Sequence, residues 1–536
     1  MTSPVSSRPS DCAWGAFDDV APWVLDPNNI SWEKQAIELR VSAQREVPVL
    51  TTPTRVPPVA RLVVVVWVLS KALVPWFVKK KLRPFATPED SRAYISLRMR
   101  KAVERLGSTY IKLGQIISSG EGLFPAELVN EFKLCRDQVP AIPFESVKKT
   151  IENELGKPLT EVFSYIDTTA LAAASIAQVH LATLITGEEV VVKVQRPTVS
   201  KMVRKDLRVM AWLAPHLVGR IKVSALANPP ALVELFAETI VEELDFRIEA
   251  SNMLDVAKML SELNQDRYII PRPHPTLATQ RVLVMQRLSG FKFDDVVGMK
   301  DAGIDTHAVI RTGMIAFMEG AMIYGVFHGD LHGGNLFVMP DGRTALLDFG
   351  IVGRLTGARR MAFLRLMLNA TTNNVVGQVE ALRDLGALPM DTDIHAVIKD
   401  LNLGDAAIDP TTLSGEELVK EVQRIVKALM GYGARMPKEL MLYVKNMVFL
   451  DGAIARLAPE LDILAEIASI SMLFAERHGE RLGRELGVDH TAIEINLDSV
   501  KTGVLGVDAS VNSLTYRDLQ ARRELIQKRM RDHVGR

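Results

Sequence analysis

The chain has 536 residues, which is enough for several domain-sized units with buried cores. Its 64 Lys and Arg residues balance 64 Asp and Glu residues, so the net charge is zero and a nucleic-acid partner is not expected. Cys12 and Cys135 are the only cysteines, which excludes a disulfide framework or a CxxC metal site and fits a reducing, cytoplasmic compartment. The opening residues lack the basic-then-apolar order of a signal peptide.

Two segments precede any chemical motif. Residues 1–56 predict a loosely packed leader with one helical run near Trp32–Arg45. Residues 57–83 include the apolar run 62–78, whose 17 residues would rise about 25 Å as a helix against a bilayer core of about 30 Å. Three interpretations stay open: an interfacial membrane anchor, a covering helix of the protein core, and a membrane span. Interfacial binding is favoured by three kinds of residue. The apolar run is interrupted by Ser70, Lys71 and Pro75, it contains the aromatic residues Trp67 and Trp76, and it is followed by the basic residues Lys79, Lys80 and Lys81.

Residues 91–160 predict a helical segment. A good helix start at Thr87-Pro88-Glu89-Asp90 leads into one amphipathic helix, Ser91–Ser119, with apolar residues spaced by three and four. This helix ends in KLGQ, which contains Lys112, Gly114 and Gln115, and Gly120 is a suitable C-cap. By itself KLGQ also fits an ordinary helix surface.

Residues 161–290 are predicted to form a kinase-like N-lobe, and they begin with strand-like alternation. The runs Val162–Ile166, Ile176–Leu184 and Val190–Val194 predict three strands, and Thr186-Gly187 predicts a hairpin turn between the last two. Lys193 lies on the third strand, where a kinase has the lysine that contacts the α and β phosphates of ATP. The residues that stand where a kinase carries its Gly-rich loop are Ala172, Ala173, Ala174 and Ser175.

A lysine on an apolar strand needs an acidic partner. The predicted helix Ala231–Ala250 supplies candidates, because Glu243 and Glu249 are six residues apart and therefore about 120° apart around a helix. We assign Glu249 to Lys193, and Glu243 together with Asp245 to Lys112. The alternative is that these acids form a solvated face.

A further strand, Arg281–Arg287, leads into Leu288–Gly290, which would be the hinge that holds adenine. Met285 would lie at the back of the nucleotide pocket and Arg287 at the hinge. A core role for Met285 is equally compatible with the pattern.

The stretch His328–Gly350, HGDLHGGNLFVMPDGRTALLDFG, has the residue spacing of a phosphoryl-transfer site. Asp330 would be the base-position carboxylate, and Asn335 and Asp348 would be Mg²⁺ ligands, since Mg²⁺ prefers hard oxygen donors. The apolar runs 336–338 and 344–347 around Pro340-Asp341-Gly342 predict the hairpin that joins the two ligands.

The residues after Gly350 separate this chain from conventional protein kinases. Only seven residues precede a predicted helix, Ala358–Asn369, and no Ala-Pro-Glu motif follows, so a peptide-docking activation segment is not expected. Residues 291–400 are predicted to form the C-lobe and 401–536 a helical extension. The periodic segments beyond residue 370 are Val375–Leu385, Glu416–Leu429, Glu439–Leu457, Leu461–Phe474 and Tyr516–His533.

Taken together, these positions resemble the UbiB/AarF family of atypical kinase-like proteins, over roughly Ser91–Leu355. KLGQ is similar to the family's Lys-x-Gly-Gln motif, AAAS at 172–175 to its Ala-rich loop, and ELD at 243–245 to its Glu-x-Asp motif. The resemblance implies an α+β, bilobal kinase-like fold with an N-terminal helical extension over the cleft. It also implies Mg²⁺-ATP binding, ATPase activity rather than protein phosphorylation, a regulatory role for the Lys-x-Gly-Gln and Glu-x-Asp residues, and peripheral membrane association.

The function expected from the residues and the resemblance is a Mg²⁺-ATP-dependent regulator of isoprenoid quinone or prenyl-lipid metabolism at a membrane. Its partners would be ATP, a lipid or quinone precursor and a membrane surface. One alternative is a small-molecule phosphotransferase of the aminoglycoside or choline kinase kind, in which HGDLHxGN is equally at home. The other is a non-catalytic, nucleotide-gated scaffold.

Overall fold

The computed structural model describes residues 30–83, 85–118, 125–135, 140–218, 228–355, 357–372, 374–401, 429, 431–487, 510–511 and 513–534. The chain divides into two compact units. The first unit comprises Met1–Gly290, Asn335–Met339 and Arg343–Val352, and the second comprises Phe291–Gly334, Pro340–Gly342 and Gly353–Arg536. The predicted α+β class is confirmed, whereas the predicted cap at Gly120 and residues 416–428 of the predicted helix Glu416–Leu429 lie outside the described residues.

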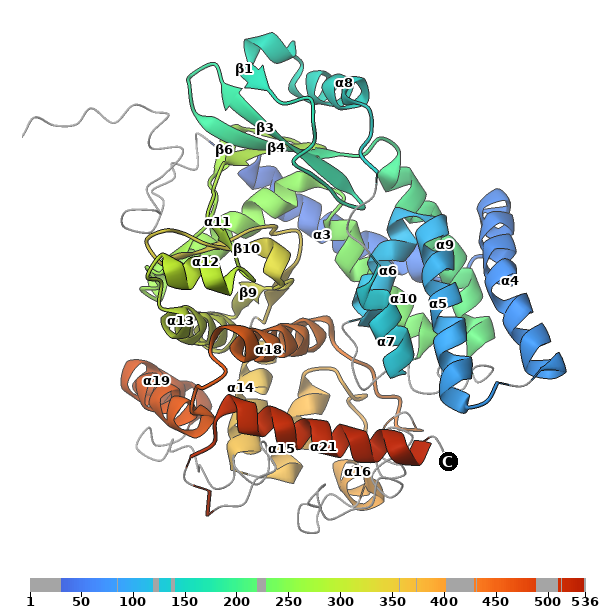
Figure 1. The fold of residues 1–536 in the computed structure, drawn as a ribbon, viewed down its shortest axis with the longest axis vertical. Helices are drawn as coiled ribbons and strands as arrows, with labels where there is room; N and C mark the ends of the chain where they lie inside the picture. The colour runs from blue at the N-terminus through green and yellow to red at the C-terminus, as the bar shows by residue number, and fades with distance from the viewer. Residues whose placement is uncertain are drawn as a thin grey trace, which may run out of the picture. The chain divides into compact units, whose positions relative to one another are not determined.

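An antiparallel sheet forms the centre of the first unit, with strand order β1-β3-β4-β7-β6 and β2 paired to β3 (Figure 1). The predicted strands and the 186–187 hairpin are confirmed, and Gly187 adopts φ +99°, which only glycine takes without strain. The strands are β1 (Phe163–Ile166), β2 (Ala172–Ala173), β3 (Ala177–Leu184), β4 (Glu189–Gln195), β6 (Pro273–Ala278) and β7 (Val282–Gln286).

Alternation along β4 decides which side chains enter the core. Val190, Val192 and Val194 are all 0% exposed and pack with Val147 and Ile151 of α8 (Phe144–Leu155). Because successive side chains of a strand point to opposite faces, the lysine between two of these valines points away from α8. That opposite face of the sheet is the one that α11 (Phe246–Glu262) contacts (Figure 1).

The N-terminal helices are more broken and more tightly packed than the sequence indicated. The predicted single helix Ser91–Ser119 is wrong: α5 (Pro88–Leu106) and α6 (Ser108–Ser118) are separated by Gly107 at φ +96°. Apolar periodicity continues across one interrupting residue, so the pattern could not reveal the break. The helix start at Thr87 is confirmed by a reciprocal capping box with Asp90.

The expectation of a loosely packed leader is also wrong for α3 (Glu33–Thr51). The Trp32 side chain before it is 2% exposed and donates to the carbonyl of His274 at 3.1 Å. Arg40 donates to Ser251 Oγ at 3.2 Å and to Asn252 Oδ1 at 2.9 Å, so α3 is fixed to α11. Polar composition predicted an open segment because it does not report these long-range partners.

The apolar segment forms α4 (Val59–Leu82) beside α5 (Figure 1). Pro75 has no N–H, so the carbonyl of Lys71 lacks its helical donor. Arg98 of α5 replaces it, donating to the carbonyl of Lys71 at 2.6 Å and to that of Ala72 at 2.9 Å. Of the described helices, α4 is the one long and apolar enough to cross a membrane, and little of it is buried. Its exposed large apolar side chains are Val59, Val63, Val64, Val66, Trp67, Val74, Phe77, Val78 and Leu82.

The predicted hairpin after the central motif is confirmed as β10 (Leu336–Val338) and β11 (Thr344–Leu346). Strand β11 also pairs in parallel with β5 (Tyr268–Ile269). Both strands of the hairpin therefore belong to the first unit, although they fall within the predicted C-lobe segment 291–400. The remaining helices of this unit are α6, α7 (Ala126–Lys133), α9 (Val199–Leu217) and α10 (Pro229–Glu242).

The second unit is helical around an aromatic core. Tyr443 of α18 stacks on Phe317 of α13 with ring centroids 5.0 Å apart, and it meets Phe327 and Phe363 edge-on. This cluster joins α18 to the strand that precedes residues 328–335. The elements are α12 (Val296–Asp301), α13 (Thr306–Glu319), a π-helical turn Gly320–Tyr324, β9 (Val326–His328), α14 (Ala358–Thr371), α15 (Val375–Asp384), α16 (Ile394–Leu401), α18 (Lys438–Leu457), α19 (Ile463–Leu486) and α21 (Tyr516–Val534).

Candidate active site

Lys193 lies between two carboxylates in the first unit. Its Nζ is 2.7 Å from Glu249 Oε1 and 3.1 Å from Asp348 Oδ1. The Glu249 side chain is 4% exposed and that of Asp348 is 49% exposed, so one partner is internal and the other faces solvent. The predicted pairing of Lys193 with Glu249 is therefore confirmed, and the arrangement leaves an exposed carboxylate next to a fixed ammonium group.

Burial and neighbouring charges set the protonation of this group. Burial alone would lower the pKa of Lys193, but the carboxylates of Asp348 and Glu249 raise it above the ordinary value, so the side chain is a permanent cation. Burial raises the pKa of Glu249 to about 7; Lys193 opposes this shift, and the charge of Asp348 adds to it. Close to neutral pH, the protonation of Glu249 therefore depends on the charges of Lys193 and Asp348.

This raised pKa predicts how stability depends on pH. Because the folded state holds the Glu249 proton more tightly than the unfolded state, the contribution to stability is present below about pH 4.5 and is lost as pH rises to about 7. The slope cannot exceed about 1.4 kcal/mol per pH unit. Urea unfolding at pH 5 to 8 should show the difference in unfolding free energy, wild type minus Glu249→Gln, falling with pH. A difference that rises with pH would contradict the assignment.

The second predicted pair, Lys112 with Glu243, is also confirmed, with Nζ 2.9 Å from Oε1. It lies close to the first pair, because a Cβ added at Gly350 would come within 3.3 Å of Asp348 Oδ1 and 3.4 Å of Glu243 Cγ. A residue without a side chain at position 350 is what lets these groups approach. Three carboxylates and two lysines are therefore gathered in one part of the first unit.

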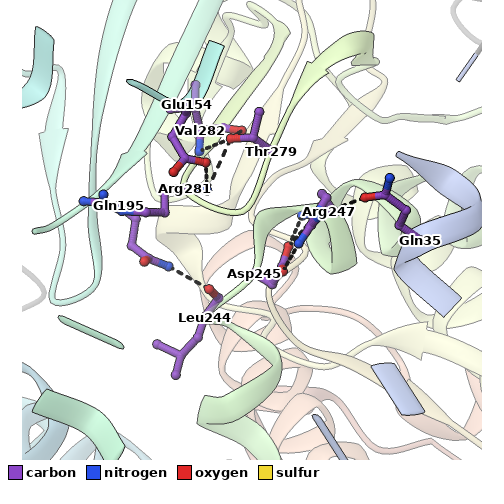
Figure 2. A network of polar contacts seen from close by, with 9 residues as sticks. All are labelled: Gln35, Glu154, Gln195, Leu244, Asp245, Arg247, Thr279, Arg281 and Val282. Atoms are coloured by element: carbon purple, nitrogen blue, oxygen red, sulfur yellow. Dashed lines mark hydrogen bonds and ion pairs between the residues drawn. The ribbon is translucent and has the colours of Figure 1, made fainter. Parts of the chain in front are cut away.

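The helix that carries the acids differs from the prediction. It is interrupted between Glu242 and Phe246, so α10 and α11 are separate helices and the 120° argument does not apply. Figure 2 shows how the interruption is held: Gln195 of β4 donates to the carbonyl of Leu244 at 3.0 Å, and Asp245 caps α11 through the backbone N–H of Arg247.

The assignment of Asp245 to Lys112 is wrong for the same reason. Both oxygens of Asp245 accept hydrogen bonds from the guanidinium group of Arg247, which also donates to Gln35 (Figure 2). Asp245 therefore fixes the turn that orients Glu243 and Glu249, and the ion pair with Lys112 is left to Glu243. An N-cap aspartate just before a helix was the signal that could have revealed this.

The other candidate residues occupy the same unit. Ala172 and Ala173 pair with β3, and the N–H of Ala174 donates to the carbonyl of Ala177 at 2.8 Å, so this segment is a tight hairpin. Met285 lies on β7 with 9% exposure, and Arg287 makes a surface ion pair with Glu189 at 3.3 Å. The remaining candidates are Gly114 and Gln115 on α6 and Ser175 before β3.

Asp330 belongs to the second unit, whereas Asn335 and Asp348 belong to the first. Within its own unit Asp330 Oδ1 forms an ion pair with Lys445 of α18. The adjacent Asn446 is 0% exposed; its Oδ1 accepts from the N–H of Leu331 at 3.0 Å, and its Nδ2 donates to the carbonyl of His328. Neither Lys445 nor Asn446 was predicted, because the apolar spacing of a helix does not indicate a partner 115 residues away.

Asn446 should matter for stability. Asn446→Ala removes the donor and the acceptor that hold the backbone of the loop at His328 and Leu331, so the N–H of the buried Leu331 loses this partner. We therefore expect a loss of about 2 kcal/mol in unfolding free energy. Urea unfolding measures it, with the exposed neighbour Met447→Ala as the control. Equal stability of the two variants would show that the contacts with Asn446 do not hold the loop.

The donor set suits one kind of metal. Among the described residues no group of three or more His, Cys, Asp and Glu side chains is arranged to hold an ion, so an all-protein metal cage is not found there. Mg²⁺ in phosphoryl-transfer sites instead takes one or two protein oxygens and completes its shell with phosphate oxygens and water. The half-exposed carboxylate of Asp348 fits such a role, as does the amide oxygen of Asn335, which lies directly before β10.

Two features define a kinase-like protein. One is a lysine held by an internal glutamate and by an aspartate that precedes Phe-Gly, and the other is a loop with the pattern Asp-x₄-Asn. The profile of the ABC1 atypical kinase-like domain matches residues 134–382, and the chain belongs to this family of UbiB- and aarF-type proteins. The predicted family and kinase-like fold class are thus confirmed.

Two curated relatives show the same relationship. An uncharacterized chloroplastic aarF domain-containing protein kinase of Arabidopsis thaliana is 32% identical, over 69% of this chain and 73% of its own length. A probable protein kinase UbiB of Marinobacter nauticus is 30% identical, over 73% and 70% of the two chains. A Mycobacterium tuberculosis protein solved in complex with erythromycin matches with a TM-score of 0.36 and 21% identity, over 65% of this chain and 91% of that one.

Proposed function

We propose that this protein binds Mg²⁺-ATP and hydrolyses ATP, as an atypical kinase-like regulator of isoprenoid quinone or prenyl-lipid metabolism. The observation that carries the proposal is the position of Lys193 between the internal Glu249 and the exposed Asp348. Membership of a kinase-like family, with relatives named UbiB, supports it.

Each residue has a distinct role in this proposal. Lys193 contacts the α and β phosphates and is held there by Glu249, while Asp348 and Asn335 hold Mg²⁺. The metal would supply neutralisation of phosphate charge. Asp330 orients the attacking water and accepts its proton. As the O–H bond of the water breaks, the water oxygen bonds to the γ-phosphorus, and the bond from that phosphorus to the ADP oxygen breaks.

The Lys112–Glu243 pair and the hairpin of alanines are proposed to regulate the site. Lys112 comes from the helical extension, and its partner lies beside Gly350, so the extension contributes charge where Asp348 is exposed. Alanine does not readily adopt the positive φ angles that let a Gly-rich loop wrap around phosphates. The pocket residues Ala172–Ser175, Met285 and Arg287 are proposed to line the nucleotide site.

A cytoplasmic membrane surface is the proposed location. The exposed apolar face of α4, followed by Lys79–Lys81, supports interfacial binding, since apolar and basic groups together favour an anionic lipid surface. One side of this helix is fixed to α5 by Arg98, which leaves the other side for lipid. The lipid substrate or quinone precursor would then reach the enzyme from the bilayer.

Thermal unfolding tests nucleotide binding. Mg²⁺-ATP at about 100 times its dissociation constant should stabilise the protein by about 2.7 kcal/mol. Two controls, ATP with EDTA and Mg²⁺ without ATP, should each stabilise it much less. Phosphate release should then be measured with and without anionic liposomes. No shift with Mg²⁺-ATP and no phosphate release would overturn the proposal. A hydroxyl compound that consumes ATP stoichiometrically would instead indicate a small-molecule phosphotransferase. Cellular function that survives Asp330→Asn but not Lys193→Ala would indicate a scaffold.

A further inference from the structure

The catalytic loop His328–Asn335 contains no Lys or Arg. Phosphoryl transfer gathers negative charge on the reacting oxygens, and enzymes place fixed cations around them. In this chain a cation beside the base-position carboxylate comes from another element, since Lys445 of α18 pairs with Asp330.

The contact is part of a built arrangement rather than a surface pair. The side chains of Lys445 and Asp330 are only 21% and 16% exposed, which reduces solvent screening of their attraction. Asn446, the next residue, binds the loop backbone at His328 and Leu331. Two consecutive residues of α18 therefore hold the same loop, one through charge and one through backbone hydrogen bonds.

The aromatic core fixes the helix that carries them. Tyr443 of α18 stacks on Phe317 and meets Phe327, which lies one residue before His328. Because Tyr443 and Lys445 are on one helix, the packing of Tyr443 sets the position of the Lys445 backbone, and the ion pair with Asp330 directs the ammonium group.

We propose that Lys445 is a positioning residue for phosphoryl transfer: it keeps the Asp330 carboxylate aimed, and α18 is thereby a required part of the catalytic centre. This inference rests on the proposed Mg²⁺-ATP function. It also extends the centre beyond residues 134–382, the part that matches the family profile. A misplaced base lowers the rate of the chemical step and leaves nucleotide binding, which Lys193 provides, almost unchanged.

Kinetics of the full chain test the inference. Lys445→Met and Lys445→Gln should lower kcat for ATP hydrolysis by roughly 10- to 100-fold and change KM for Mg²⁺-ATP by less than about threefold. Lys445→Arg, which keeps the cation, should recover most of the rate. Arg456→Met removes an exposed cation from the same helix and should match the wild type.

The outcomes separate the inference from the function on which it rests. Wild-type protein without Mg²⁺-ATP turnover would mean that the proposed function fails. An active wild type with equally active Lys445→Met and Lys445→Gln variants would overturn the role of Lys445 alone. So would an equal rate loss in Lys445→Arg, or loss of Mg²⁺-ATP binding in both neutral variants, because either result indicates a contribution other than positioning Asp330.

Discussion

Asp348→Asn should abolish the Mg²⁺-dependent stabilisation by ATP and lower kcat by a factor on the order of 100 or more. The Asp348 carboxylate is the exposed partner of Lys193, and removing its charge takes away the proposed metal ligand. Asparagine is the appropriate replacement because Asp348 adopts φ +57°, a left-handed conformation that asparagine tolerates and alanine does not. The change therefore tests charge with little added strain in the backbone.

The measurement is a thermal-shift titration with Mg²⁺-ATP, followed by phosphate release under saturating nucleotide. Asp266→Asn is a suitable control, because Asp266 is exposed and belongs to the same unit. If Asp348→Asn kept both the thermal shift and the turnover of the wild type, Asp348 would not be the metal ligand and the kinase-like assignment of this site would be wrong.

Lys193→Met should lose both stability and nucleotide binding. It leaves the internal Glu249 without its cation, and breaking a buried ion pair costs about 3–5 kcal/mol. The loss should be larger at pH 8 than at pH 5, because an unpaired Glu249, whose pKa is already raised to about 7, takes up a proton in acid. Urea unfolding at both pH values measures this difference.

A second variant separates folding from function. Lys193→Met combined with Glu249→Gln removes both charges and should recover much of the stability, but not the nucleotide binding that the lysine provides. Lys258→Met breaks an exposed Lys–Glu pair at 3.9 Å on α11 and should cost less than about 1 kcal/mol. Recovery of Mg²⁺-ATP binding in the double variant would remove Lys193 from the proposed site.

Several parts of the site could be predicted because each depends on local pattern. Alternating valines placed Lys193 on a strand with one buried face, and the turn residues at 186–187 and 340–342 determined the hairpins. An internal lysine requires an acidic partner, and residues 243–249 contain few acids, so the pairs with Glu249 and Glu243 could be assigned. Charge and periodicity carry this information without any knowledge of the rest of the fold.

By itself the sequence thus determined the strands around Lys193, the two lysine–glutamate pairs and the hairpin that ends at Asp348. Only the tertiary structure decided the breaks at Gly107 and Leu244, the burial of Trp32 and the pairing of Asp330 with Lys445. Helical periodicity runs unchanged through a single non-helical turn, and a contact between residues far apart leaves no trace in either local pattern. Such contacts form only when packing, here the stacking of Tyr443 on Phe317, brings distant segments together.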